Sequence, residues 1–131
     1  MFRTMLVEDN PSFRQILKGN LGDLFPSMEI IEAADGVEAF QQIDLDRPDL
    51  IFMDIRLPGE NGLELTRKIK ANHPGIIVIV LTSYESPEYR EAAIRFKADH
   101  FFSKDAITSN EIFTLVKSIV SKKDVSTESS E

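Results

Sequence analysis

Cysteine is absent from all 131 residues of the chain. Disulfide bonds and thiolate-bound metals are therefore excluded, and a chain without cysteine fits the reducing cytosol. No hydrophobic run approaches the length of a membrane-spanning helix, and no basic-then-apolar signal opens the chain. We expect a cytoplasmic protein that makes no contact with membranes.

Basic residues are also few. Fifteen Lys and Arg stand against 22 Asp and Glu, which gives a formal net charge of −7 at pH 7. Proteins that bind nucleic acid meet its dense negative charge with clusters of Lys and Arg. This composition predicts that the chain itself does not bind DNA or RNA directly.

The length and the hydrophobic content of 42% fit one globular domain with its own core. The last residues, VSTESSE from Val125 to Glu131, are polar and lack aromatic side chains, as is typical of disordered tails. We assign residues 1–123 to the domain and residues 124–131 to a disordered polar tail or the start of a linker.

Short apolar segments alternate with segments of helical periodicity along the whole chain. The clearest helical stripe comes last and includes Ile112, Val116 and Ile119. Capping residues, two of them followed by proline, stand before four helical segments: Asn10-Pro11, Asp35, Asn61 and Ser86-Pro87. The expected strands are Arg3–Val7, Glu29–Ala33, Leu50–Asp54, Ile76–Thr82 and His100–Ser103.

A strand followed by a helix, repeated five times, predicts an α/β fold: a five-stranded doubly wound parallel sheet with helices on both faces. The third and fourth strands are almost wholly apolar, as strands covered on both faces are. Open sheets of this kind bind ligands beyond the carboxyl ends of their strands. The residues that follow each strand are therefore the place to look for function.

Polar side chains stand at four of these strand ends: Glu8 and Asp9, Asp54, Thr82, and Lys104. Each alone has an ordinary explanation, as a solvated loop acid, a residue with strand propensity or a surface cation. Together they would place three carboxylates, a hydroxyl and an ammonium at one edge. Such oxygen ligands favour Mg²⁺ or Ca²⁺, and a carboxylate can act as a nucleophile and form an aspartyl-phosphate.

Four motifs in order resemble the response-regulator receiver domains of two-component signalling, which have the CheY-like, flavodoxin-like fold with strand order 2-1-3-4-5. They are the acid pair Glu8-Asp9, the MDIRLPGENG segment that contains Asp54, the VLTS segment with Thr82, and FFSK, which ends at Lys104. The segment AADGVEA after the second strand also resembles the family. The resemblance covers the chain from about Phe2 to Lys122.

The resemblance implies a metal site. Asp9 and Asp54 would bind Mg²⁺ together with the backbone carbonyl of Arg56, and Glu8 would assist through a coordinated water. Asp54 would also be the phosphoacceptor.

It also implies a switch. Thr82 and Lys104 would contact the phosphoryl group, and Thr82 would move towards it. Phe101 stands at the aromatic switch position, so the face formed by the fourth helix, fifth strand and fifth helix would change.

The partners implied are a sensor histidine kinase or a phosphotransfer protein as phosphodonor. A second copy of the domain is a further expected partner once it is phosphorylated. The domain would be a signalling switch and no enzyme beyond its own phosphorylation and dephosphorylation. It would control an attached output domain, or a partner if it stands alone. The pair Lys104-Asp105 resembles receivers attached to DNA-binding outputs, which favours a role in transcription regulation.

Two other functions remain open from the residues alone. An aspartyl-nucleophile phosphatase of the haloacid-dehalogenase type would need a second carboxylate two residues after Asp54, where Arg56 stands. A flavodoxin-like electron carrier would need a phosphate-cradling loop after the first strand, where Glu8 and Asp9 would repel phosphate.

Several residues depart from the family pattern. Glu8 stands where Asp is commoner, Ser83 where Ala or Gly is usual, and Asp105 where proline is usual. Without proline we expect no cis peptide bond after Lys104. Phe101 lacks the hydroxyl of the commoner tyrosine, so a switch at this position would depend on packing alone.

Overall fold

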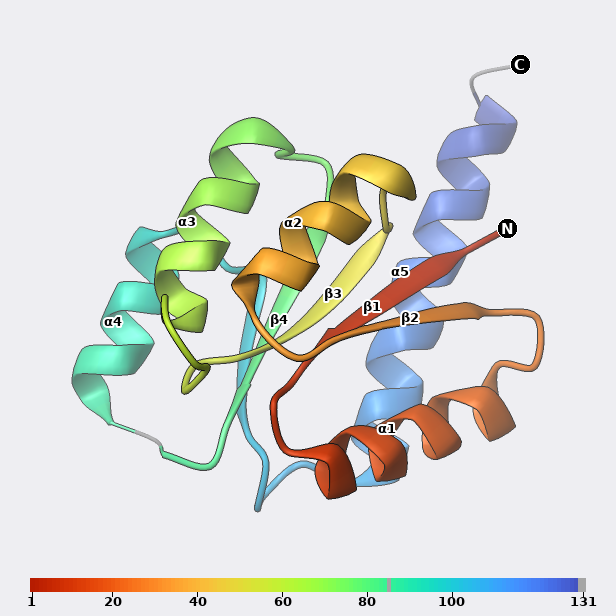
Figure 1. The fold of residues 1–131 in the computed structure, drawn as a ribbon. Helices are drawn as coiled ribbons and strands as arrows, with labels where there is room; N and C mark the ends of the chain where they lie inside the picture. Colours follow the sequence, from red (N-terminus) through yellow and green to blue (C-terminus); the bar gives the residue numbers. More distant parts are fainter. Residues whose placement is uncertain (85, 130–131) are drawn as a thin grey trace.

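The computed structural model of the chain describes residues 1–84 and 86–129, with side chains described as far as Lys123. Its centre is a parallel sheet of five strands in the order β2-β1-β3-β4-β5 (Figure 1). The predicted fold class and strand order are confirmed. The strands are β1 (Arg3–Val7), β2 (Glu29–Ala33), β3 (Leu50–Asp54), β4 (Ile77–Thr82) and β5 (His100–Ser103).

One strand boundary differs from the prediction. Strand β4 begins at Ile77, whose backbone N–H donates to the carbonyl of Asp49, while the N–H of Ile76 donates back to His73 in the preceding turn. Ile76 is nonetheless fully buried. The apolar side chain made Ile76 resemble a strand residue, although its backbone belongs to the turn.

Five helices connect the strands: α1 (Pro11–Leu24), α2 (Gly36–Leu45), α3 (Gly62–Asn72), α4 (Pro87–Arg95) and α5 (Ser109–Ser129). The four predicted caps form. The side chains of Asn10, Asp35, Asn61 and Ser86 each accept hydrogen bonds from backbone N–H groups in the first turn of α1, α2, α3 and α4. These caps fix where each helix leaves the loop that follows a strand.

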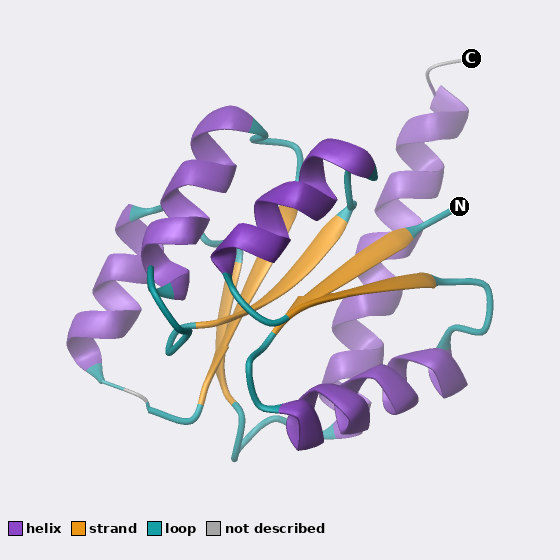
Figure 2. Cartoon of the chain, in the orientation of Figure 1, coloured by secondary structure: helices purple, strands orange, loops and turns teal. Residues whose placement is uncertain are grey.

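Two apolar layers enclose the sheet, with α2, α3 and α4 on one face and α1 and α5 on the other (Figure 2). Alternate residues of each central strand point to opposite layers, as the two-residue period of a strand requires. In β3, Ile51 and Met53 pack under α2 and α3, while Leu50 and Phe52 pack under α1 and α5. Both faces of the central strands are therefore buried.

The parallel register aligns the carboxyl ends of the strands. Val7 pairs with Ala33 and Met53, and Thr82 pairs with Ser103. The loops that leave β1, β4 and β5 run along the lower edge of the sheet in Figure 1. The residues that follow these strands are thus brought together by pairing alone.

Helix α5 continues to Ser129, past Lys123, where we expected the folded domain to end. Its last turns project beyond the strands in Figure 1. Residues 130 and 131 lie outside the described residues, and the assignment of residues 124–131 to a tail or linker stays a prediction. Among the helices described, none is both long enough and apolar enough to cross a lipid bilayer.

Candidate functional site

Asp54 is the last residue of β3, and its side chain is nearly enclosed, with 7% of the residue exposed. Burial raises the pKa of Asp54 to about 7, and the neighbouring Glu8 carboxylate adds to the rise, while Lys104 opposes it. The backbone behind Asp54 is just as tightly packed. A Cβ atom on Gly62 would lie 1.8 Å from the Asp54 carbonyl oxygen, so only glycine fits where α3 begins.

Glu8 and Asp9 follow β1 and differ in their surroundings. Glu8 is 3% exposed, its N–H donates to the carbonyl of Ala33 on β2, and its carboxylate forms an ion pair with Lys104. The second carboxylate oxygen of Glu8 accepts from the N–H of Asn10 at 3.1 Å. Asp9 is exposed. One acid of the pair is therefore fixed inside the site, and the other stands at its opening.

The three acids form one cluster. Glu8, Asp9 and Asp54 each offer a carboxylate oxygen, and these oxygens lie within 4.8 Å of one another. The prediction that the first and third strands deliver carboxylates to one place is confirmed geometrically. An all-oxygen donor set of this kind matches the ligands that Mg²⁺ and Ca²⁺ take in proteins.

Lys104 brings an ammonium to the cluster from the end of β5. Its backbone N–H donates to the Thr82 carbonyl at 2.9 Å, which holds the loop after β5 against β4. Its Nζ pairs with Glu8 and lies 3.5 Å from an oxygen of Asp54. The ammonium also lies over the ring of Phe13 on α1, at 4.4 Å from the centroid. The predicted convergence of Lys104 and Asp54 is thus present.

Thr82 is fully buried at the end of β4, but its hydroxyl is occupied within its own loop. The hydroxyl accepts from the N–H of Tyr84 at 3.0 Å and lies 3.3 Å from the Tyr84 carbonyl. The guanidinium carbon of Arg56 lies over the Tyr84 ring, 3.8 Å from the ring centroid. The Arg56 side chain therefore bridges the loops after β3 and β4, while the metal-binding role of its carbonyl stays a prediction.

Phe101 is half-buried on β5 and packs against the apolar layer under α4. The guanidinium of Arg90, on α4, lies 4.7 Å from the centre of its ring. Lys104 joins Asp105 by a trans peptide bond, since the described residues contain no cis bond, as we expected without proline. His100 stacks on Phe102 at the other end of β5, away from the acids.

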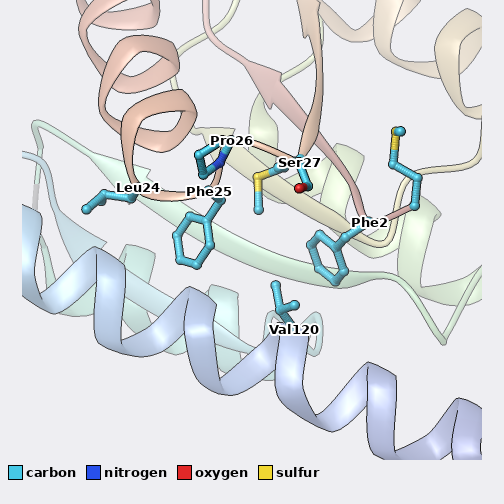
Figure 3. Close-up of a pocket in the computed structure, with 8 residues that line it drawn as sticks. Phe2, Leu24, Phe25, Pro26, Ser27 and Val120 are labelled. Atoms are coloured by element: carbon cyan, nitrogen blue, oxygen red, sulfur yellow. The ribbon is translucent and has the colours of Figure 1, made fainter.

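An apolar cavity lies away from this cluster. It measures about 480 Å³ and lies at the opposite edge of the sheet, between the end of α1, the start of β1 and α5 (Figure 3). Its walls are mainly apolar and include Phe2, Phe25 and Val120. It offers no cluster of titratable groups, so the acidic edge remains the candidate site.

The sequence did not single out two residues of α1 that contact the site. The ring of Phe13 faces the ammonium of Lys104. Arg14 follows it and donates from Nη1 to the Glu8 carbonyl at 2.6 Å. Both contacts join α1 to loops that follow a strand, and neither leaves a residue pattern from which it could have been predicted.

Comparison with known proteins identifies the family of this chain. The sequence profile of the response regulator receiver domain matches residues 4–117. The DNA-binding transcriptional activator DevR/DosR of Mycobacterium tuberculosis is 34% identical over 120 residues, which are 91% of this chain and 54% of that protein. The chain spans about half the length of the curated relatives it matches.

Solved structures agree. The receiver domain protein (CheY-like) of Methanospirillum hungatei superposes with a TM-score of 0.86 at 25% identity, covering 96% of this chain and 98% of that one. The phosphorylated cyanobacterial phytochrome response regulator RcpA gives a TM-score of 0.75 at 27% identity, over 90% of each chain. Sequence profile, fold and strand-end residues lead to one conclusion: this chain belongs to the response regulator receiver domain family of two-component signalling.

Proposed function

We propose that this domain is switched by transfer of a phosphoryl group to Asp54. The observation that carries the proposal is the surroundings of one carboxylate. Asp54 is nearly enclosed at a strand end, an ammonium lies 3.5 Å away, and two further carboxylates lie within 4.8 Å. Such a carboxylate is poised to act as a nucleophile towards a phosphorus atom, provided that the added negative charge is neutralised.

The chemistry assigned to the chain's own residues is brief. An oxygen of Asp54 attacks the phosphorus of a phosphohistidine, the P–N bond breaks, and the histidine nitrogen keeps the electron pair and takes a proton. Lys104 is held at the site by Glu8 and the ring of Phe13, from where its ammonium can pair with a phosphoryl oxygen. Positioning and charge neutralisation supply most of the rate enhancement in this class of reaction.

A divalent cation completes the charge balance in this proposal. Glu8, Asp9 and Asp54 would hold Mg²⁺, and the carbonyl of Arg56 is proposed as a further ligand. When bound, Mg²⁺ supplies positive charge that offsets the repulsion among the carboxylates and the incoming phosphoryl group. The fit rests on the all-oxygen cluster, in which three carboxylates each place an oxygen within 4.8 Å of the others.

The phosphodonor that we propose is a sensor histidine kinase or a phosphotransfer protein, since receivers of two-component systems take phosphate from phosphohistidine. RcpA, with the same fold, is known in phosphorylated form. DevR/DosR, which matches most of this chain, is a DNA-binding activator. An attached DNA-binding output is therefore the arrangement we favour, and a stand-alone receiver that acts on a partner protein is the alternative.

The proposed switch starts at Thr82. To reach a phosphoryl group on Asp54, its hydroxyl must leave the turn that it forms with Tyr84. Phe101 would then move from beneath the Arg90 guanidinium, which contacts its ring from α4. We propose that the face formed by α4, β5 and α5 changes as a result and pairs with a second copy. Light scattering with and without a beryllofluoride phosphoryl mimic tests this step: a monomer under both conditions contradicts it.

Intact mass spectrometry tests the central step. The wild type and Asp54→Asn are incubated with Mg²⁺ and acetyl phosphate, and we expect one phosphoryl adduct on the wild type only. The adduct should be labile to base, as an acyl phosphate is. An adduct of equal yield on Asp54→Asn would assign the phosphate to another residue and overturn the proposal.

The two other functions considered have no support at this site. The residue two positions after Asp54 is Arg56, whose guanidinium stacks on Tyr84 and offers no carboxylate for acid–base catalysis of a phosphatase. The loop after β1 contains the acids Glu8 and Asp9, which would repel the phosphate of a flavin. Membership of the receiver family fits neither an electron carrier nor such a phosphatase.

A further inference from the structure

Arg14 contacts the main chain of the acidic loop that follows β1. Its Nη1 donates to the carbonyl oxygen of Glu8 at 2.6 Å, and its Nε donates to a carboxylate oxygen of Glu32 at 3.0 Å. Only 19% of the Arg14 side chain is exposed. One guanidinium therefore joins three elements: helix α1, from which it comes, strand β2, and the loop that follows β1 (Figure 1).

The carbonyl that Arg14 holds determines where Asp9 points. A peptide unit is planar, so the Glu8 carbonyl and the Asp9 nitrogen belong to one rigid group. The N–H on the other side of Glu8 is fixed by the carbonyl of Ala33. Within the described part of the chain, the Asp9 side chain has no hydrogen-bond or ion-pair partner of its own. Its direction therefore depends on the peptide unit that Arg14 holds.

Glu32 is a firm anchor for this contact. One of its carboxylate oxygens accepts from Arg14 and from Gln15 at 3.2 Å, and the other accepts from Lys18 at 2.9 Å. The hydrogen bond from Lys18 and then that from Arg14 lower the pKa of Glu32, against the opposing effect of burial. The carboxylate thus stays charged near neutral pH, and a charged partner orients the planar guanidinium well.

We propose that Arg14, anchored by Glu32, is a positioning residue for the divalent-cation site: it sets the Glu8–Asp9 peptide so that the Asp9 carboxylate meets the cation. This inference rests on the proposed function, because it assumes that the acidic cluster binds Mg²⁺. Partners of metal ligands that do not touch the metal typically change affinity by about 10- to 100-fold when they are removed.

The sign of the effect separates positioning from simple electrostatics. Arg14 carries a positive charge close to an acidic cluster, so its removal by itself strengthens the attraction for a cation. Loss of positioning does the opposite. Lys18 offers a matched control, because it pairs with the same Glu32 carboxylate but donates to no backbone group of the acidic loop within the described residues.

Isothermal titration with Mg²⁺ provides the test, using the wild type, Arg14→Met and Lys18→Met. Both variants lose one positive charge and one ion pair to Glu32. We expect the Mg²⁺ dissociation constant of Arg14→Met to rise about tenfold and that of Lys18→Met to stay equal or fall slightly. Thermal unfolding of both variants in EDTA is the control for stability. If Arg14→Met and Lys18→Met lose similar stability, a difference in their Mg²⁺ affinity cannot come from a merely structural role of Arg14.

The outcomes are distinct. If the wild type binds Mg²⁺ and Arg14→Met binds it equally well or more tightly, the positioning role is overturned and the proposed function is left intact. A wild type that does not bind Mg²⁺ overturns the metal step of the proposed function and this inference together. Should Arg14→Met fail to fold, Glu32→Gln decides: it keeps Arg14 but weakens its anchor, and an unchanged Mg²⁺ affinity in that variant overturns the proposal.

Discussion

Two nearly buried lysines lie at opposite edges of the sheet, and their surroundings differ. Lys70, near the end of α3, has a side chain that is 9% exposed, and that of Lys104 is 11% exposed. The ammonium of Lys70 donates to the carbonyl oxygens of Pro74 and Ile76 and to the carboxylate of Asp99. Each of its three hydrogens has an acceptor.

Charge at the Lys70 edge is balanced. Asp99 faces one ammonium and also accepts from the N–H of Val78 at 2.8 Å, the first buried residue of β4. At the carboxyl edge, Lys104 is the one ammonium among the described residues that pairs with Glu8 and Asp54, and Asp9 stands nearby. One ammonium cannot neutralise three carboxylates. Burial raises the pKa of Asp54 to about 7, and the neighbouring Glu8 carboxylate adds to this rise.

This comparison separates two kinds of buried ion pair in a single fold. At the Lys70 edge the ammonium has an acceptor for each hydrogen, and Asp99 holds the start of β4. The Lys104 edge is left with negative charge that burial makes costly, and a cation or a change of protonation relieves it. A site that is incomplete without a ligand is a site that can bind one.

The largest expected effect comes from the backbone behind the carboxyl edge. Gly62→Ala would place a Cβ 1.8 Å from the carbonyl oxygen and 2.8 Å from the carbonyl carbon of Asp54, so the loop after β3 must shift. We expect a loss of about 3 kcal/mol or more in the free energy of unfolding, together with slower phosphorylation. Urea denaturation measures the first and intact mass the second.

Gly19→Ala is the matched control for this substitution. Gly19 lies on the exposed face of α1 with nothing within 4 Å of the added Cβ, so alanine should stabilise the helix by about 0.5–1 kcal/mol. If Gly62→Ala were as stable as Gly19→Ala, the close approach to Asp54 would not constrain the site.

The two lysines should differ in what their removal costs. Lys70→Met leaves the Asp99 carboxylate and two carbonyls without their cation, so we expect a loss of about 2–3 kcal/mol in stability with phosphorylation retained. Lys104→Met should fold, because protonation of Asp54 relieves the cluster, but should phosphorylate about 100-fold more slowly. Denaturation and phosphorylation rates, measured on both variants, check the contrast. The comparison would be contradicted if Lys70→Met slowed phosphorylation and Lys104→Met lost mainly stability.

The stability of Asp54→Asn relative to the wild type should depend on pH. Since the folded pKa of Asp54 lies near 7, above the ordinary value of 3.8, the folded wild type binds the proton more tightly than the unfolded chain. Its contribution to stability is present at low pH and is lost as pH rises from about 4 through 7.

Asparagine does not titrate there. We expect Asp54→Asn, without Mg²⁺, to be more stable than the wild type by about 2 kcal/mol at pH 8 and by much less at pH 5. Urea denaturation in EDTA at both pH values measures this difference. A difference that is the same at pH 5 and pH 8 would show that the pKa of Asp54 is not raised in the folded protein.

The smallest effect is expected far from the acids, at the apolar cavity of Figure 3. Val120 lines this cavity from α5 and is only half-buried, so Val120→Ala should cost about 1 kcal/mol. Phosphorylation of Asp54 should be unchanged, because the cavity and the acids lie at opposite edges. A change in phosphorylation rate would show that the two edges are coupled through the sheet.

Much of the fold was predictable because its signals are local. The bounds of β1, β2, β3 and β5 agree with the prediction, and four helices begin after the predicted caps. Apolar runs and capping residues act on their immediate neighbours. The start of β4 was predicted one residue early because the Ile76 side chain is buried like that of a strand residue, while its backbone N–H belongs to the preceding turn.

The sequence by itself determined which chemical groups reach the carboxyl edge. Asp54 and Thr82 are the last residues of their strands, and Glu8 and Lys104 directly follow theirs. Tertiary structure alone decided how these groups are held. Three contacts show this. Glu8 pairs with Lys104, the Thr82 hydroxyl is bound within the turn to Tyr84, and Arg14 donates to the Glu8 carbonyl. Each depends on atoms that are distant in the sequence or belong to the main chain. Such contacts are set by the packing of α1 and the strand-end loops, which residue order does not encode locally.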